Sequence, residues 1–340
     1  MTNIVISDAT LRDGSHAISH QLTKDQIAAY AKAADAAGIP IVEVGHGNGL
    51  GASSLQVGLS LLSDVEMLET AKSNLSHAKL GIHVIPGFAT IKKDLALAFE
   101  LGVDVVRLAS HCTEADITER HISYSREKGK EVYGVLMMSH MASKELLLEE
   151  ALKMQSYGAE GLIIMDSAGA YLPADVTERI THLATHLHIP VGFHAHNNLG
   201  MSIANSIAAV EAGAKMLDAS ARGFGAGAGN AQLEVLIAVL DKMGYHTGIN
   251  LYKALDAAEV VENMIMKTVP SIKSESIVSG LAGVFSGFAK HVMRAAKEYN
   301  VDPRDIFFEL GNRKVVAGQE DIIVEIALAL HDKPKRGPHA

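Results

Sequence analysis

The sequence predicts an α/β protein in which a (β/α)8 TIM barrel is followed by an all-α C-terminal appendage. Three observations support this prediction. The chain has 340 residues, more than one ordinary domain needs. Over residues 1–245 one pattern recurs, in which an amphipathic helix ends at a glycine and a β-branched apolar run follows. After residue 248 these runs stop and only helical patterns remain.

Eight apolar runs are predicted to be the strands of the barrel. The first covers residues 4–8. Five others follow a glycine at a position where a helix C-terminus favours a left-handed residue, within segments 35–45, 99–110, 126–138, 155–167 and 210–220. The remaining two are 80–85 and 191–196. Runs that are apolar throughout are typical of parallel strands buried on both faces.

The segments between these runs are predicted to be helices, because several begin after a capping residue. Thr23 precedes the helical pattern 24–34, and Ser143 precedes 144–154. Eight alternations of strand and helix are the pattern of a (β/α)8 barrel. A doubly wound open sheet could use the same units, but the first βα turn lacks the glycine fingerprint of a dinucleotide site, which favours the barrel.

The chain is therefore expected to divide into three parts. Residues 1–248 would form the catalytic barrel, 249–331 a helical C-terminal domain and 332–340 a flexible tail. Within the second part, three stretches have a helical pattern: 251–265, 279–299 and 319–331.

The composition excludes several classes of function. A net charge of −9 and the absence of tryptophan give no basic or stacking surface for nucleic acid or an anionic membrane. A single cysteine, Cys112, rules out an internal disulfide framework and fits a reducing cytoplasm. The sequence shows no secretory leader and no apolar run of membrane-spanning length. We therefore expect a cytoplasmic protein.

The most specific local motif is GFHAHNNLG at 192–200, at the end of the predicted seventh strand. His194 and His196 are two residues apart, so on a strand both imidazoles point to the same side. Active sites of such barrels lie at the C-terminal ends of the strands. The alternative is that both are hydrogen-bonded core histidines, but two imidazoles with a nearby carboxylate are a common metal-binding set.

The loop after the first strand, SDATLRDGSHAISH at 7–20, supplies candidate carboxylates. In a closed barrel the first strand lies two strand spacings from the seventh, roughly 10 Å. Asp8 and Asp13 are both candidates, and Asp13 is better placed because it lies just beyond the strand end. The predicted divalent metal site is therefore Asp13, His194 and His196.

Two further residues of this loop suit catalysis. Arg12 could stabilise developing negative charge on a substrate oxygen. His16 is the residue type that moves protons near neutral pH. His83 lies within the third predicted strand, where alternation could turn it inward, and Cys112 has no evident activating partner.

Taken together, these segments resemble the metal-dependent barrels that handle pyruvate, and most strongly the 4-hydroxy-2-oxovalerate aldolases. The same group includes 3-hydroxy-3-methylglutaryl-CoA lyase and the isopropylmalate and homocitrate synthases. The resemblance covers nearly the whole chain through SDATLRDGSHAISHQ, ASHCTEADI, LMMSHMAS, DSAGA, HAHNNLGMSIANSIAAVEAG, GAGAGNAQLEVLIA and VAGQEDIIVEIAL.

The resemblance implies retro-aldol cleavage of 4-hydroxy-2-oxopentanoate, or of a longer 4-hydroxy-2-oxo acid, to pyruvate and acetaldehyde or a longer aldehyde. By position, Asp13, His194 and His196 would hold a divalent ion, expected to be Mn²⁺, on which the substrate binds. His16 would be the base, Arg12 the enolate stabiliser and Ser167 a substrate contact. The appendage would dock an acylating acetaldehyde dehydrogenase, and an oligomer is expected.

The sequence departs from the family pattern at two positions. Phe285 stands in GVFSGF, where the family has tyrosine in GVYSSF, and His83 stands in LGIHVIPG in place of an aliphatic residue. Both are expected to contact the substrate and to change the preferred aldehyde.

The sequence leaves two alternatives to the aldolase. One is a Claisen-type synthase or lyase that uses an acyl-CoA, which the glycine loop GFGAGAGN at 223–230 disfavours, because it lacks the acidic–basic pair or cysteine of those relatives. The other is a non-catalytic partner subunit of an aldehyde dehydrogenase. A scaffold would not need the complete set of candidate catalytic and metal-binding residues.

Overall fold

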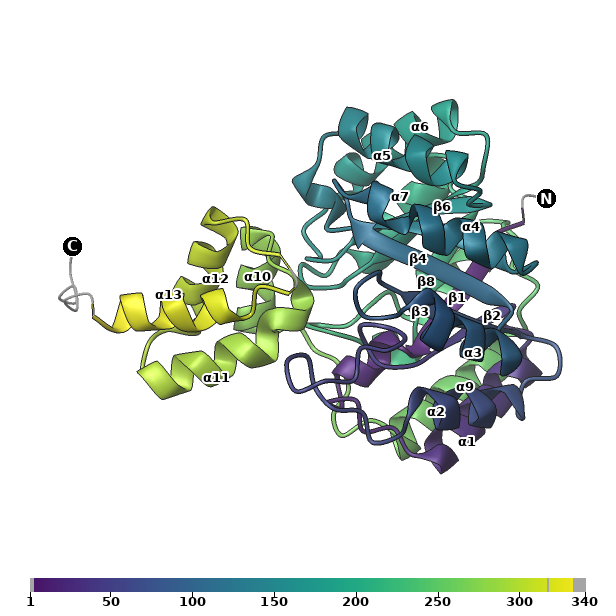
Figure 1. Cartoon of the computed structure of the whole chain (residues 1–340), viewed down its shortest axis with the longest axis horizontal. Coiled ribbons are helices and arrows are strands. Elements are labelled where there is room, and N and C mark those ends of the chain that lie inside the picture. Colours follow the sequence, from purple (N-terminus) through teal and green to yellow (C-terminus); the bar gives the residue numbers. More distant parts are fainter. Residues whose placement is uncertain (1–2, 317, 333–340) are drawn as a thin grey trace.

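The computed structural model describes residues 3–316 and 318–332 and confirms the predicted barrel. Eight parallel strands close in sequence order, with β8 pairing to β1 (Figure 1). The strands are β1 (Val5–Leu11), β2 (Ile41–Val44), β3 (Lys79–Val84), β4 (Val105–His111), β5 (Glu131–Met137), β6 (Gly161–Asp166), β7 (Val191–Ala195) and β8 (Met216–Ala219). The first strand is longer than predicted, so it delivers Arg12 directly to the barrel rim.

Helices follow the strands around the barrel. The α-helices are α1 (Lys24–Ala37), α2 (Asp64–Lys72), α3 (Ala96–Glu100), α4 (Glu119–Glu127), α5 (Lys144–Ser156), α6 (Pro173–His186), α7 (Ser202–Glu211), α8 (Leu233–Lys242) and α9 (Leu251–Met264). Short 3-10 or π turns are η1 (Asp13–His16), η2 (Ile91–Leu95), η3 (Ala115–Thr118), η4 (Ser139–Met141) and η5 (Ala221–Gly223).

The predicted helix starts are confirmed by hydrogen bonds. The Thr23 hydroxyl accepts from the Gln26 N–H and the Gln26 side chain accepts from the Thr23 N–H, which forms a capping box. The Ser143 hydroxyl accepts from the Leu146 N–H. Gly38 ends α1 with φ of 80°, a conformation that glycine adopts without a Cβ clash.

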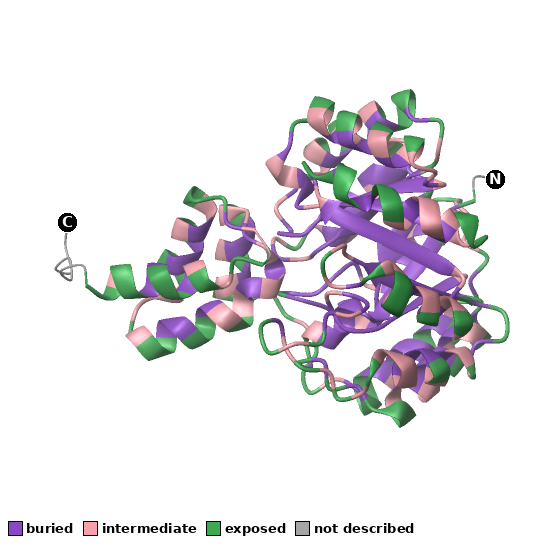
Figure 2. Ribbon diagram, in the orientation of Figure 1, coloured by how far each residue is buried: buried purple, intermediate pink, exposed green. Residues whose placement is uncertain are grey.

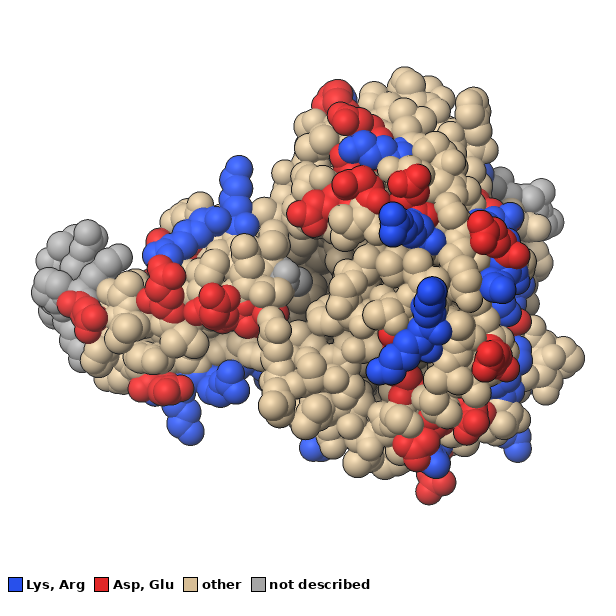
Figure 3. Space-filling view, in the orientation of Figure 1, with Lys and Arg blue, Asp and Glu red and all other residues tan. Residues whose placement is uncertain are grey.

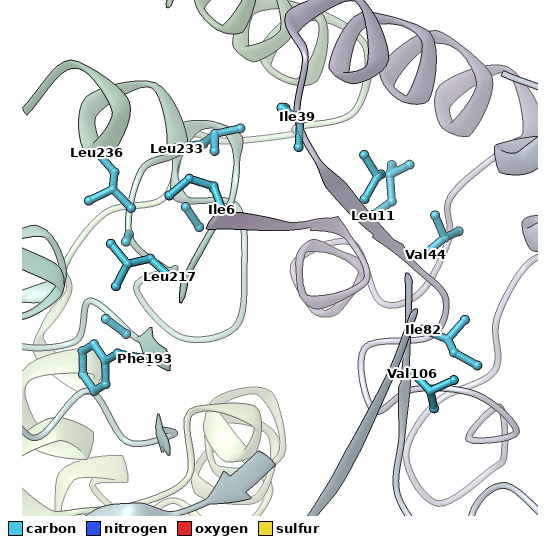
Figure 4. Close-up of a cluster of buried hydrophobic side chains, with 14 of the residues drawn as sticks. Ile6, Leu11, Ile39, Val44, Ile82, Val106, Phe193, Leu217, Leu233 and Leu236 are labelled. Atoms are coloured by element: carbon cyan, nitrogen blue, oxygen red, sulfur yellow. The ribbon is translucent and has the colours of Figure 1, made fainter. Parts of the chain in front are cut away.

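The strands are buried on both faces, as Figure 2 shows. Their outward side chains pack under the helices, and Figure 4 shows part of this core, including Ile6, Val44, Ile82, Val106, Phe193 and Leu217 with Leu233 and Leu236 of α8. Their inward side chains form a second apolar cluster that fills the barrel: Ile41, Val105, Ala109, Tyr133, Val135, Ile163, Met165 and Met216.

The C-terminal helices stand to one side of the barrel (Figure 1). They are α10 (Ser274–Ala282), η6 (Ser286–Phe288), α11 (Ala289–Tyr299), α12 (Pro303–Asn312) and α13 (Asp321–His331). Their separate core contains Val284, Phe288, Val292, Ile306, Phe307, Leu310, Ile323 and Ile326. The stretch 279–299 is helical in pieces, because Gly283 turns into the left-handed region with φ of 65° and ends α10.

The division of the chain at residues 248 and 249 stays a prediction. Helix α9 lies beyond that boundary, yet Ala254, Ala257, Ala258 and Val261 pack in the core of the barrel. The expected tail at 332–340 lies outside the described residues except for Asp332.

The distribution of surface charge and the character of the helices are as the amino-acid composition predicts. Acidic and basic side chains are interspersed over the face seen in Figure 3. In the described part of the chain, no helix combines the length and the apolar character that a membrane span requires.

Candidate metal centre and active site

The three predicted metal ligands converge at the C-terminal end of the barrel. Asp13 begins η1 and is separated from the end of β1 by one residue, His194 lies near the end of β7 and His196 follows that strand. One potential ligand atom from each residue lies within 4.8 Å of the others, and all three residues are buried. The structure therefore brings together residues that are more than 180 positions apart in the sequence.

The donor atoms of this group fit a divalent cation. Within the described chain, His194 Nε2 and His196 Nδ1 are buried and have no hydrogen-bond partner. His194 Nδ1 donates to Asp218 Oδ2 at 2.9 Å, which leaves the lone pair of Nε2 for a metal. A carboxylate oxygen with two imidazole nitrogens suits several first-row transition metals.

The protonation states of the group also suit a metal. Burial alone would raise the pKa of Asp13, but the positive charge of Arg12 and the neighbouring imidazoles of His196, His16 and His194 lower it below its ordinary value, so the carboxylate is ionised. Burial lowers the pKa of His196 to about 3, so its imidazole is neutral at neutral pH. Metal ligands must be deprotonated in this way.

Arg12 lies against the same group. Its Nε donates to Glu43 Oε2 at 2.9 Å, and its Nη1 donates to Asp13 Oδ1 at 3.2 Å and to the Gly47 carbonyl at 3.3 Å. Its Nη2 is buried and has no partner among residues 3–316 and 318–332. The guanidinium is therefore fixed on one side and keeps free donors for an oxygen in the site.

His16 ends η1, and its Nε2 lies 4.0 Å from Asp13 Oδ1. Burial lowers its pKa to about 4, so the ring is neutral at neutral pH and can accept a proton. Gly47 lies so close to this ring that a Cβ there would come within 2.5 Å of it, so any other residue would displace the ring.

Two histidines that the sequence did not single out pack beside His16. The rings of His20 and His46 are stacked with centroids 3.6 Å apart, and the His16 ring lies 5.1 Å from His20 and 6.4 Å from His46. His46 Nε2 donates to the Gly58 carbonyl at 3.1 Å and its Nδ1 accepts from the Asn48 N–H at 3.0 Å. These bonds fix its tautomer.

Ser167 and Phe285 lie where the C-terminal helices meet the barrel. The Ser167 hydroxyl accepts from the Met138 N–H, and its carbonyl accepts from the Ser286 N–H, each at 3.0 Å. The half-buried Phe285 lines a cavity of about 800 Å³ together with His16, His20 and Lys290. This cavity opens between the barrel rim and the C-terminal helices.

His83 is 2 % exposed, and its Nδ1 has no hydrogen-bond partner in the part of the chain described here. Burial, reinforced by the nearby charge of Arg12, lowers its pKa well below the ordinary value. Cys112 is buried, and its thiol donates to the Met138 carbonyl at 3.3 Å. Burial raises the pKa of this thiol to about 12, which agrees with a structural role.

Four polar residues around the site were not predicted. Glu43, Arg107 and Asp218 are single charged residues within apolar strands, and that isolation was the signal that could have revealed them. Asn230 ends the glycine loop, and its Nδ2 donates to Asp13 Oδ2 at 2.5 Å. Asp8, a second carboxylate candidate, instead accepts from the Tyr30 hydroxyl at 2.6 Å and from Thr10.

Comparisons with known proteins agree with this geometry. A family model described as HMGL-like matches residues 3–261, and one described as a DmpG-like communication domain matches residues 270–332. The carboxyl transferase domain of Rhizobium etli pyruvate carboxylase with pyruvate and biocytin superposes with a TM-score of 0.81 at 15% identity, over 96% of this chain and 60% of that one. That likeness shows the fold alone.

Relatives with much higher sequence identity to this chain share one name. The chain is 64% identical to a 4-hydroxy-2-oxovalerate aldolase of Spirochaeta aurantia over 98% of each chain. It is 63% identical to one of Pectobacterium atrosepticum, over 95% of this chain and 94% of that one. The barrel, the converging Asp13, His194 and His196, and this full-length identity place the chain in the HMGL-like family, among the 4-hydroxy-2-oxovalerate aldolases.

Proposed function

We propose that the protein is a divalent-metal-dependent aldolase that cleaves 4-hydroxy-2-oxopentanoate, or a longer homologue, to pyruvate and an aldehyde. One observation carries the proposal: the buried ligand set Asp13, His194 and His196 lies beside Arg12 and His16, in a chain 64% identical to a 4-hydroxy-2-oxovalerate aldolase. These residues supply what a metal-dependent retro-aldol reaction needs: metal ligands, a cation that stabilises the enolate, Arg12, and a general base, His16.

Each residue has a separate task in this reaction. A divalent ion held by Asp13, His194 and His196 would supply Lewis-acid polarisation of the 2-oxo group. The neutral His16 accepts the proton of the C4 hydroxyl. As that C–O bond becomes a carbonyl, the C3–C4 bond breaks and its electron pair forms the pyruvate enolate. The free Nη2 of Arg12 donates to the enolate oxygen, and protonation at C3 gives pyruvate.

The remaining site predictions become parts of this proposal. Ser167 contacts the substrate, which also lies against Asp13 and His194. Phe285 and His83 border the aldehyde portion and select its chain length. The cavity position of Phe285 and the buried, unpaired Nδ1 of His83 within the described chain support this assignment.

We also infer the cofactor identity, the partner and the location. Mn²⁺ is compatible with the mixed carboxylate and imidazole set, as are Fe²⁺, Co²⁺ and Zn²⁺. The DmpG-like communication domain supports docking of an acylating acetaldehyde dehydrogenase on residues 270–332. An oligomer is also expected. The buried free thiol of Cys112 supports a reducing cytoplasm.

The experiment follows pyruvate release from racemic 4-hydroxy-2-oxopentanoate by the purified protein. Addition of Mn²⁺ to metal-free protein should give turnover, and a chelator should abolish it. Asp13→Ala should remove this turnover without loss of helix content. Release that the chelator does not affect, or no release in any condition, would contradict the proposal.

A further inference from the structure

We propose that Arg107 is a positioning residue that holds the metal ligand His194 and the enolate-binding Arg12 in fixed relation. This inference rests on the proposed aldolase function and adds a residue that neither touches the substrate nor binds the metal. Arg107 lies on β4, points into the barrel and is fully buried beneath the candidate metal centre.

Arg107 joins two buried carboxylates. Its Nη1 donates to Glu43 Oε1 on β2, and its Nη2 donates to Asp218 Oδ2 on β8. Glu43 uses its other oxygen, Oε2, to accept from Arg12 Nε at 2.9 Å. Asp218 Oδ2 also accepts from His194 Nδ1 at 2.9 Å. A continuous chain of ion pairs and hydrogen bonds thus runs from Arg12 to His194.

The place of these charges in the barrel argues for a role beyond stability. Two residues earlier on the same three strands, the inward side chains are apolar: Ile41, Val105 and Met216. Apolar side chains can therefore fill the interior of this barrel without any charged group. Buried ionic groups are often no more stabilising than apolar residues of similar volume, because removing each charge from water is costly. The charged layer occurs directly beneath the site.

The geometry indicates what each contact fixes. Asp218 orients the His194 ring and keeps the proton on Nδ1, so that Nε2 faces the metal position. Glu43 holds the guanidinium of Arg12 through its Nε, and Nη2 of the same guanidinium has no partner in the described chain. The planar guanidinium of Arg107 donates from two nitrogens and so sets the separation between the carboxylates of Glu43 and Asp218. The single ammonium of a lysine could not hold both carboxylates in this geometry.

The test compares three variants by two measurements. Binding of Mn²⁺ to metal-free protein is measured by electron paramagnetic resonance, which does not depend on activity, and kcat is measured at saturating Mn²⁺. Asp218→Asn should weaken Mn²⁺ binding about 10- to 100-fold. Glu43→Gln should leave that Kd within about threefold but lower kcat about 10- to 100-fold. Arg107→Met should show both defects, and Arg107→Lys should recover them only in part.

A control separates positioning from folding. Arg179 lies on the outer helix α6 and packs over the ring of Tyr171. Arg179→Met should change neither the Kd for Mn²⁺ nor kcat. If Arg107→Met does not fold, the neutral triple variant Glu43→Gln, Arg107→Met, Asp218→Asn replaces it, with thermal unfolding of the metal-free protein as the check. The two single variants decide the question if the triple variant also fails to fold.

The proposal is overturned if Asp218→Asn binds Mn²⁺ like wild type, if Glu43→Gln keeps wild-type kcat, or if a folded triple variant keeps both wild-type values. These outcomes differ from failure of the proposed function. In that case the wild-type protein itself would release no pyruvate, while the pattern of Mn²⁺ affinities would still test whether Asp218 and Arg107 position His194.

Discussion

The ammonium nitrogen of Lys290 lies 2.7 Å from the main-chain carbonyl oxygen of His16. Lys290 belongs to α11, so a side chain of the C-terminal helices holds the segment that carries the proposed base. The same ammonium donates to the Ala17 carbonyl at 3.3 Å and to the Ser19 hydroxyl at 2.9 Å. Ser19 and His20 both have positive φ, at 57° and 62°, so this turn depends on its surroundings.

We expect Lys290→Met to lower kcat about 10- to 100-fold, because small displacements of a catalytic group have effects of that size. The affinity for Mn²⁺ should not change, since the ammonium of Lys290 donates to the 16–19 segment rather than to a candidate ligand. Steady-state kinetics at saturating Mn²⁺ and hydrogen exchange of residues 13–20 measure the two effects. The exposed Lys297 on the same helix provides the control Lys297→Met. An unchanged kcat in Lys290→Met would contradict a positioning role.

Asn230 is expected to support the metal centre from the glycine loop. Its Nδ2 donates to Asp13 Oδ2, and its Oδ1 is buried with no partner in residues 3–316 and 318–332. Asn230→Ala removes the bond that orients the Asp13 carboxylate, so the Kd for Mn²⁺ should rise about tenfold. Calorimetric titration of the metal-free protein measures this. Asn300→Gly, at an exposed left-handed position, is the control. Equal affinities in both variants would exclude the supporting role.

The grouping of Asp13, His194 and His196 could be predicted because each of its two parts has a local sequence signal. His194 lies near the end of β7 and His196 just after it, and the order of strands in a closed barrel brings β7 near β1. Once the barrel is inferred, the loop after β1 is expected within reach of the two histidines, and Asp13 is the better placed of its candidates Asp8 and Asp13. The repeated helix–glycine–strand pattern identified the barrel itself because each unit repeats the same local chemistry.

The supporting residues could not be predicted in the same way. Glu43, Arg107 and Asp218 lie on three different strands, and their pairing depends on the stagger of the barrel as well as on strand order. Lys290 meets the His16 segment only because the C-terminal helices pack over the barrel rim. That packing depends on contacts between distant parts of the chain, which no repeating pattern in the sequence indicates.

His83→Leu is expected to shift the aldehyde preference toward longer apolar chains. The substitution replaces a buried ring whose Nδ1 has no partner in the described structure with an apolar side chain. One methylene in an apolar pocket is worth about 10-fold or more in specificity. The ratio of kcat/KM for seven-carbon over five-carbon 4-hydroxy-2-oxo acids should therefore rise about tenfold. The same ratio in both proteins would exclude His83 from the aldehyde side of the pocket.

Phe285→Tyr tests the other departure from the family pattern. Phe285 packs edge-on against Phe288 with centroids 5.5 Å apart and lines the cavity beside His16. An added phenol hydroxyl could donate to the C4 oxygen of one enantiomer of the substrate. We expect similar kcat but a changed preference between the two C4 enantiomers, measured with resolved substrates. An unchanged enantiomer ratio would show that the position does not face C4.

The stacked pair His20 and His46 should make the protein sensitive to acid. Burial lowers the pKa of His20 to about 2 and that of His46 to about 4, so both rings are neutral in the folded protein at neutral pH. Below pH 6.5 the unfolded chain binds a proton at each ring that the folded chain does not bind. The free energy of unfolding should therefore fall as pH falls from 6.5 toward 4, by about 1.4 kcal/mol per pH unit for each ring.

His46→Gln isolates this effect. Asp8 and Asp166, whose pKa burial raises to about 6, act in the opposite direction between pH 6 and 3.8, so only the difference between variants is informative. The amide of glutamine can still donate to the Gly58 carbonyl but cannot bind the extra proton. Urea unfolding of the metal-free protein at pH 4.5 to 7.5 should show, below pH 6.5, a slope that is smaller than that of wild type by about 1.4 kcal/mol per pH unit. Parallel slopes in wild type and His46→Gln would mean that His46 takes up its proton equally in the folded and unfolded protein.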